Sequence, residues 1–171
     1  MCIRDRNINI KDHVFHQDDY RYLVEYSREA FYVYGEADRD TTPKTGMVHN
    51  VDLESKITKS VHKQMQDTFP EEMSKYDSPS RVYINCFAPR EDAYYHTDGG
   101  KGSKTCLIYL SNTSWVPVLC GETFFYQDDK VIGVPPHPNR VVCFDGNILH
   151  RASSFRKGHR FTLALKYPEI K

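Results

Sequence analysis

The sequence has no long hydrophobic run and no excess charge of either sign. No stretch approaches the roughly 20 apolar residues that a membrane-spanning helix needs, so we expect no membrane partner. Lysine plus arginine and aspartate plus glutamate are balanced at 23 each. A chain without net charge has no global field that attracts nucleic acid, so we expect no nucleic-acid partner either. What is left is an ordinary globular composition, with 39% hydrophobic residues.

Paired cysteine motifs are also missing. The five cysteines are Cys2, Cys86, Cys106, Cys120 and Cys143. They are dispersed and odd in number, which fits neither a disulfide framework nor a zinc site. We therefore expect reduced thiols in a reducing compartment and a cytoplasmic location.

The first six residues, MCIRDR, are typical of a translated sequencing adaptor rather than of evolved protein. We expect residues 1–6 to be non-native, the source to be metagenomic and the native start to be missing. A targeting signal could have been lost with that start, so the cytoplasmic assignment carries this alternative with it.

The N-terminal part of the chain has helical periodicity. Apolar residues recur at helical spacing over about 18–34 and about 53–68. For the second of these helices, Asp52 is the expected N-cap and Pro70 ends the pattern. Between them, the Gly-, Asp-, Thr- and Pro-containing segment 35–50 predicts a long loop.

The remainder of the chain has the alternation that is typical of strands. Five runs of this kind cover residues 81–87, 105–110, 122–126, 141–144 and 160–166. Several short strands separated by turn signals favour a sandwich or barrel. We predict one domain over 1–171 that is mainly β with supporting helices. Residues 7–80 would form helical support packed on one sheet, and residues 81–167 a double-stranded β-helix (jelly roll) core with a central pocket.

Three residues of the β part have the types and order of a non-haem iron site. His96 and Asp98 are two positions apart and therefore lie on one face of any extended segment, while His150 comes from a later segment. A lone His-x-Asp pair is a weak signal, and a surface histidine is the alternative interpretation. Two histidines and one carboxylate with open positions form the facial triad of non-haem Fe(II) oxygenases.

A candidate anion clamp follows on the last predicted strand. Arg160 and Thr162 share a face of this strand, and a buried arginine needs an anionic partner. A guanidinium fork suits the distal carboxylate of a dicarboxylate, with the Thr162 hydroxyl as a further donor. The Tyr109 hydroxyl could reach the same carboxylate, although a packing role is equally consistent. His159 is an alternative to His150 as metal ligand, but should point away from Arg160.

Other polar residues are candidates for lining the pocket. Tyr83 is a candidate cosubstrate contact, whereas Asn85, Tyr94 and Tyr95 are candidates for the substrate side. Most tyrosines in a β-rich chain serve packing, so we expect only one or two of these to be functional. His49 lies in the predicted long loop, which could act as a lid or contact the substrate.

Together these motifs resemble the Fe(II)/2-oxoglutarate-dependent dioxygenases, and most closely their prolyl 4-hydroxylase-like branch. The matching segments are residues 96–98, 105–112, 121–123, 139–146, 150 and 160–162. The resemblance implies Fe(II) as the metal, 2-oxoglutarate and O2 as cosubstrates, and ascorbate as a candidate reductant. The residues that it assigns to the metal are His96, Asp98 and His150, and those assigned to 2-oxoglutarate are Arg160, Tyr109 and Thr162.

The resemblance also implies an activity, namely hydroxylation of an unactivated C–H bond coupled to oxidative decarboxylation of 2-oxoglutarate. Peptidyl proline is the leading substrate, and a small metabolite such as a free amino acid or a sugar is the alternative. A cupin-like isomerase or metal-binding module is an alternative of another class, but it would not need Arg160. Phe87 stands where some relatives carry a cosubstrate-contacting tyrosine, so Tyr83 is the candidate to supply that contact. The carboxylate of Asp98 disfavours a halogenase.

Overall fold

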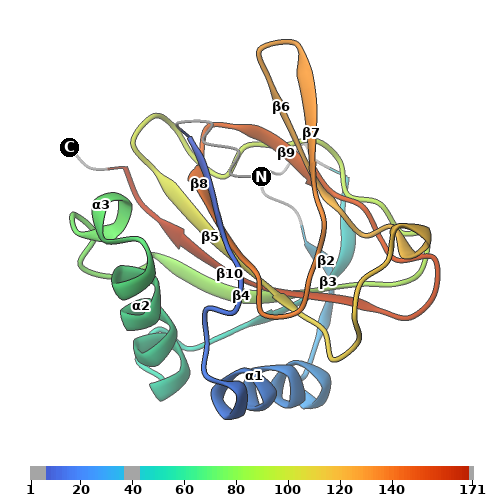
Figure 1. Ribbon diagram of the computed structural model, residues 1–171, viewed down its shortest axis with the longest axis horizontal. Coiled ribbons are helices and arrows are strands. Elements are labelled where there is room, and N and C mark those ends of the chain that lie inside the picture. Colours follow the sequence, from blue (N-terminus) through green and yellow to red (C-terminus); the bar gives the residue numbers. More distant parts are fainter. Residues whose placement is uncertain (1–6, 37–42, 170–171) are drawn as a thin grey trace.

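Two antiparallel sheets face each other in the computed structural model, which describes residues 7–36 and 43–169 (Figure 1). The larger sheet has seven strands in the order β1-β8-β5-β10-β4-β3-β2, and the smaller has three in the order β7-β6-β9. The strands are β1 Ile8–Lys11, β2 Val33–Glu36, β3 Thr45–Asn50, β4 Arg81–Phe87, β5 Lys104–Leu110, β6 Thr123–Gln127, β7 Lys130–Val134, β8 Val141–Asp145, β9 Leu149–Ala152 and β10 Arg160–Tyr167. This arrangement confirms the predicted jelly-roll class.

The helices cover the outer face of the larger sheet, as predicted (Figure 1). They are α1 Gln17–Glu29, α2 Lys56–Thr68 and the short α3 Pro70–Met73. Val61 and Met65 of α2 are buried in one core cluster with Ile108, Leu163 and Leu165 of the sheet. Burial of this apolar stripe, rather than helix propensity, is what stabilises helices of this length.

The inner face of the larger sheet forms a second core against the smaller sheet. Leu107 and Ala164 belong to it, together with Phe125 from β6. Because successive side chains of a strand point to opposite faces, β10 directs Leu163 and Leu165 to the helices and Ala164 to the space between the sheets. The same alternation carries the polar residues of β10 into that space.

The prediction of a long loop over residues 35–50 is wrong at both ends of that range. Residues 45–50 form β3, which pairs with β4, and β2 pairs with β3. The sequence does not resemble a strand locally, so the ladder with β4 is what orders it. Gly46 has a φ of +67°, and a Cβ there would lie 2.9 Å from the Phe87 ring. Glycine is thus required where β3 passes this ring.

Other boundaries also differ from the prediction. The first helix ends at Glu29, since Ala30 is already extended, and the second begins at Lys56 with Ser55 as N-cap instead of Asp52. The N-terminal part also supplies β1, β2 and β3, so it is not helical support alone. The prediction for residues 1–6 lies outside the described residues. Within the described part of the chain, no helix has both the length and the apolar character to cross a membrane.

Candidate metal and cosubstrate site

Main-chain hydrogen bonds bring the three predicted metal ligands together. His96 forms an isolated antiparallel bridge with His150 of β9, with N–O distances of 2.9 Å in both directions. The Asp98 amide donates to the Gly146 carbonyl at 2.8 Å. The segment after β4 is therefore attached at two points to the β8–β9 region, and this attachment makes neighbours of residues that are far apart in sequence.

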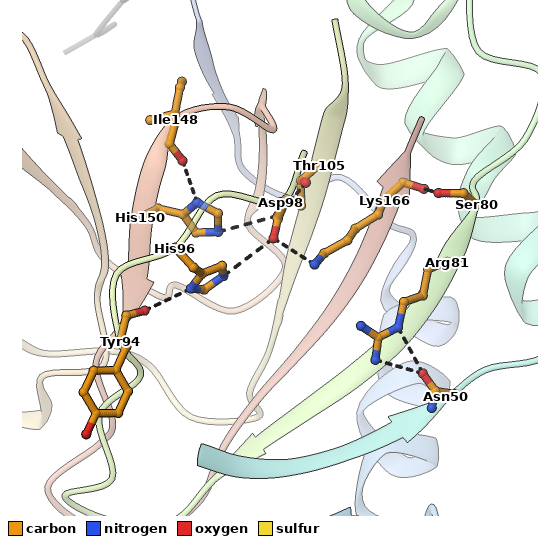
Figure 2. Close-up of polar contacts among 10 residues, drawn as sticks. All are labelled: Asn50, Ser80, Arg81, Tyr94, His96, Asp98, Thr105, Ile148, His150 and Lys166. Carbon is orange, nitrogen blue, oxygen red and sulfur yellow. Dashed lines mark hydrogen bonds and ion pairs between the residues drawn. The ribbon is translucent and has the colours of Figure 1, made fainter. Parts of the chain in front are cut away.

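Each histidine is oriented by a carbonyl two residues before it (Figure 2). His96 Nδ1 lies 2.9 Å from the Tyr94 carbonyl oxygen, and His150 Nδ1 lies 2.9 Å from that of Ile148. A carbonyl only accepts, so each Nδ1 carries a proton, and Nε2 is the atom left to bind a metal. Both Nε2 atoms face Asp98, from which they are 3.6 Å (His96) and 3.5 Å (His150) away.

The Asp98 carboxylate is held by side chains at both oxygens. The Thr105 hydroxyl donates to Oδ2 at 2.6 Å, and the Lys166 ammonium lies 2.9 Å from Oδ1. Burial raises the pKa of Asp98, but interactions with His150, His96 and Lys166 outweigh it and hold this pKa well below its usual value. The carboxylate is therefore ionised, as a metal ligand must be.

These residues fit a divalent metal ion. The ligand atoms of His96, Asp98 and His150 all lie within 4.8 Å of one another, and no other group of three potential ligands was found in the described residues. Two imidazole Nε2 atoms and one carboxylate form a set that suits Fe(II) and leaves further positions to cosubstrate and O2. Carbonyl partners at both Nδ1 atoms are the usual support of metal-bound histidines.

Arg160 is buried in the same pocket as the three ligands. Its side chain enters at the start of β10, and the residue is 1% exposed. Nε donates to the Gly121 carbonyl at 2.8 Å and Nη2 donates to Thr123 Oγ1 at 2.9 Å, yet among the described residues Arg160 has no carboxylate in an ion pair. Burial lowers the pKa of Arg160. A buried guanidinium whose hydrogen bonds go to neutral oxygens, with no carboxylate in direct contact, suits an anion.

The other predicted clamp residues, Thr162 and Tyr109, differ in whether they line the pocket. Thr162 lines the pocket, whereas Tyr109 is covered, and its hydroxyl donates to Thr123 Oγ1 at 2.8 Å. Thr123 accepts from both Arg160 and Tyr109, and within the described residues its own hydroxyl has no acceptor. This role of Thr123 was not predicted from the sequence. Its position at the start of a strand, two residues after Gly121, was the only signal.

Known proteins resemble this chain in fold but do not match it in sequence comparisons. No family model matches the chain, and neither does any curated protein. A Pseudomonas putida prolyl-4-hydroxylase is similar in structure, with a TM-score of 0.75 at 15% identity over 96% of this chain and 94% of that chain. A viral collagen prolyl hydroxylase from Paramecium bursaria Chlorella virus-1, solved with 2-oxoglutarate, has a TM-score of 0.71 at 13% identity over 98% of both chains. The chain has the fold of the 2-oxoglutarate–Fe(II) oxygenases.

The same oxygenase fold occurs in a protein whose solved structure contains a different kind of ligand. HygX from Streptomyces hygroscopicus, with nickel, 2-oxoglutarate and hygromycin B bound, has a TM-score of 0.74 at 10% identity over 96% of this chain and 83% of that chain. Structural similarity at this level of identity describes the architecture. The chemistry of this chain has to be argued from its own residues.

The predicted substrate-side residues are only partly brought together. Asn85 lines the pocket opposite Thr162 on the neighbouring strand, and its buried Oδ1 has no hydrogen-bond partner within the described residues. Tyr94 lies at the rim with 53% of its surface exposed. Tyr95 is not part of the lining, and its ring packs against the Arg151 guanidinium.

Tyr83 and His49 point to opposite faces of the larger sheet. Tyr83 lines the pocket, where its ring lies 5.3 Å from the Lys166 ammonium. His49 lies on β3 in register with Ile84, on the helix-facing side, and its ring nitrogens are 2.8 Å from the Tyr26 hydroxyl and 2.9 Å from the Phe31 carbonyl oxygen. The structure therefore places His49 outside the pocket, because strand alternation turns it towards α1.

Proposed function

We propose that this protein is an Fe(II)- and 2-oxoglutarate-dependent dioxygenase that hydroxylates an unactivated C–H bond. The observation that carries the proposal is Arg160, a buried guanidinium without a carboxylate partner in the described residues, in the pocket of His96, Asp98 and His150. A site that only bound a metal would not need it. A dicarboxylate cosubstrate accounts for the clamp and the metal ligands at once.

Each residue has a defined task in this proposal. When bound, Fe(II) and 2-oxoglutarate supply oxidative decarboxylation, which yields succinate and CO2 and drives C–H hydroxylation by O2. Asp98 and the two histidines hold the metal, and Arg160 binds the distal carboxylate with Thr162 and Thr123 as hydroxyl donors. The remaining lining is partly apolar, which limits the access of water to the reacting atoms. Tyr83 is a further candidate for a cosubstrate contact.

The substrate that we favour is a peptidyl proline. Prolyl hydroxylases are among the solved structures with this fold, and one of them, from Trichoplax adhaerens, is in complex with a peptide fragment. The hygromycin B complex of HygX supports a small metabolite as the alternative. Asn85 and the rim residue Tyr94 are the candidate substrate contacts. The four described cysteines are free, in keeping with the cytoplasmic location that we propose.

Two measurements test the reaction class and the substrate in turn. Fe(II) added anaerobically with 2-oxoglutarate should produce a visible charge-transfer band, and its absence in folded protein would contradict the proposal. Succinate formation should then be measured with ascorbate present, for prolyl peptides and free metabolites side by side. Stimulation by metabolites but not by peptides would replace the substrate that we favour.

A further inference from the structure

A lysine contacts the carboxylate of the predicted metal site, although neither the triad nor the clamp requires one. Lys166 follows Arg160, Thr162 and Ala164 in the row of β10 side chains that faces the smaller sheet. Its side chain is 12% exposed, and Nζ lies 2.9 Å from Asp98 Oδ1 (Figure 2). The carboxylate that would bind the metal therefore already has a cation beside it.

The fold fixes this ammonium in place from several sides. Lys166 is in register with Thr105 of β5, so two directly opposed residues hold the two oxygens of Asp98. The Lys166 carbonyl accepts from the Ser80 amide at 2.8 Å, and Nζ lies over the Tyr83 ring. A long, flexible side chain held in this way is a built part of the site, unlike an exposed surface ion pair.

The positive charge of Lys166 opposes metal binding through its effects on both the metal-free and the metal-bound protein. Without a metal ion, the ammonium neutralises a carboxylate whose side chain is 4% exposed, and this stabilises the metal-free protein. With a divalent ion on Asp98, the ammonium and the ion are like charges that contact one carboxylate, and this destabilises the metal-bound protein. Both effects weaken metal binding.

We infer that Lys166 is the counter-cation of the metal-free site and that it lowers the affinity of the protein for its metal by competing for Asp98. Lys166 is thus a positioning residue, which keeps the carboxylate oriented in the absence of metal and allows the ion to exchange. This inference rests on the proposed function, since it takes His96, Asp98 and His150 as the metal ligands.

The test is a titration of metal-free protein with Co(II) alone, without 2-oxoglutarate or substrate, by calorimetry and by the cobalt absorption bands. For Lys166→Met we expect the Kd for Co(II) to fall by about tenfold or more, since a buried like charge is removed. Lys166→Arg keeps the charge and should stay near wild type. Lys63→Met is the matched control, because Lys63 forms an exposed ion pair with Asp67 on α2 and should leave the Kd unchanged.

Thermal unfolding is a second readout that does not depend on activity. Metal-free Lys166→Met should melt below wild type, because Asp98 loses its partner, and Co(II) should raise its melting temperature by more than it raises that of wild type. Lys166→Gln provides a second uncharged variant if the methionine variant does not fold. Unchanged or weaker Co(II) binding by the folded uncharged variant would overturn the inference, since that is what a purely structural role predicts.

The same titration separates this inference from the proposed function. If wild type and Asp98→Ala bind Co(II) equally, the metal site itself is refuted. If wild type binds Co(II), Asp98→Ala does not, and the uncharged variants of Lys166 show no gain, then only the role of Lys166 is refuted.

Discussion

The two ends of the pocket differ in whether their buried charge has a partner of opposite sign in contact. At the metal end, the Asp98 carboxylate has Lys166 as a cation and Thr105 as a hydroxyl donor. At the clamp end, Arg160 donates to the Gly121 carbonyl and to the Thr123 hydroxyl oxygen, both of them neutral groups. The metal end thus already has a cation beside its carboxylate, whereas the clamp end has a buried cation without a carboxylate in contact. Metal uptake brings a second cation to a carboxylate that already has one, while cosubstrate uptake would supply an anion where none is in contact.

The largest expected effect is at the metal end. Asp98→Ala removes a metal ligand and the partner of Lys166, so we expect 2-oxoglutarate turnover to fall by more than about a hundredfold. Succinate formation measures it, with Asp67→Ala on the exposed face of α2 as the control. If Asp98→Ala still formed succinate at a comparable rate, the ligand assignment would be refuted.

Substitution at the clamp end should weaken 2-oxoglutarate binding without affecting metal binding. Arg160→Leu removes the guanidinium but none of the metal ligands, so we expect the Kd for 2-oxoglutarate to rise by about a hundredfold while Co(II) binding is retained. For Arg160→Lys we expect a Kd for 2-oxoglutarate between those of wild type and Arg160→Leu, because an ammonium keeps the charge without the planar fork. Loss of Co(II) binding in folded Arg160→Leu would show that the two ends are not independent.

Thr123 tests whether the neutral partners of the clamp are needed. Thr123→Val removes the hydroxyl oxygen that accepts from both Arg160 and Tyr109, so we expect a loss of about 1–3 kcal/mol in the free energy of unfolding. We also expect 2-oxoglutarate to bind about tenfold more weakly, since one charge-assisted contact to Arg160 is lost. Chemical denaturation and 2-oxoglutarate titration measure the two effects. Thr123→Ser keeps the hydroxyl and should stay near wild type in both measurements; if it lost as much as Thr123→Val, the hydroxyl would not account for the effects.

The smallest effect is expected at the alternative histidine. His159 is exposed beside Arg160, and strand alternation turns it away from the pocket. His159→Ala should therefore leave the Co(II) Kd and succinate formation within about twofold of wild type, as is usual for surface substitutions. His150→Ala is the matched variant that should lose both. Equal losses in the two variants would reopen the choice of ligand.

The strands near the site could be predicted because their signals are local. Residues 81–87 alternate and form β4 with the expected bounds, and the alternation of 160–166 placed Arg160 and Thr162 inside and His159 outside. The second helix ended before Pro70, as predicted. Each of these features depends on neighbouring residues and on a single periodicity, so the sequence is sufficient for it.

Features that depend on distant partners could not be predicted in this way. β3 exists because the Gly- and Thr-containing segment pairs with β4, and His49 on it turns towards α1, against the expectation that it would contact the substrate. Thr123 and Lys166 looked like ordinary strand residues. Their roles follow from Arg160 and Asp98, which lie far from them along the chain.

The sequence alone therefore determined the ligand types, their order and the face of the strand on which Arg160 lies. Tertiary structure alone decided the charge balance of the pocket. The cation beside Asp98 and the missing anion beside Arg160 are both consequences of the way in which β10 crosses the larger sheet. Electrostatic interactions depend on distance in space, and sequence separation does not report that distance.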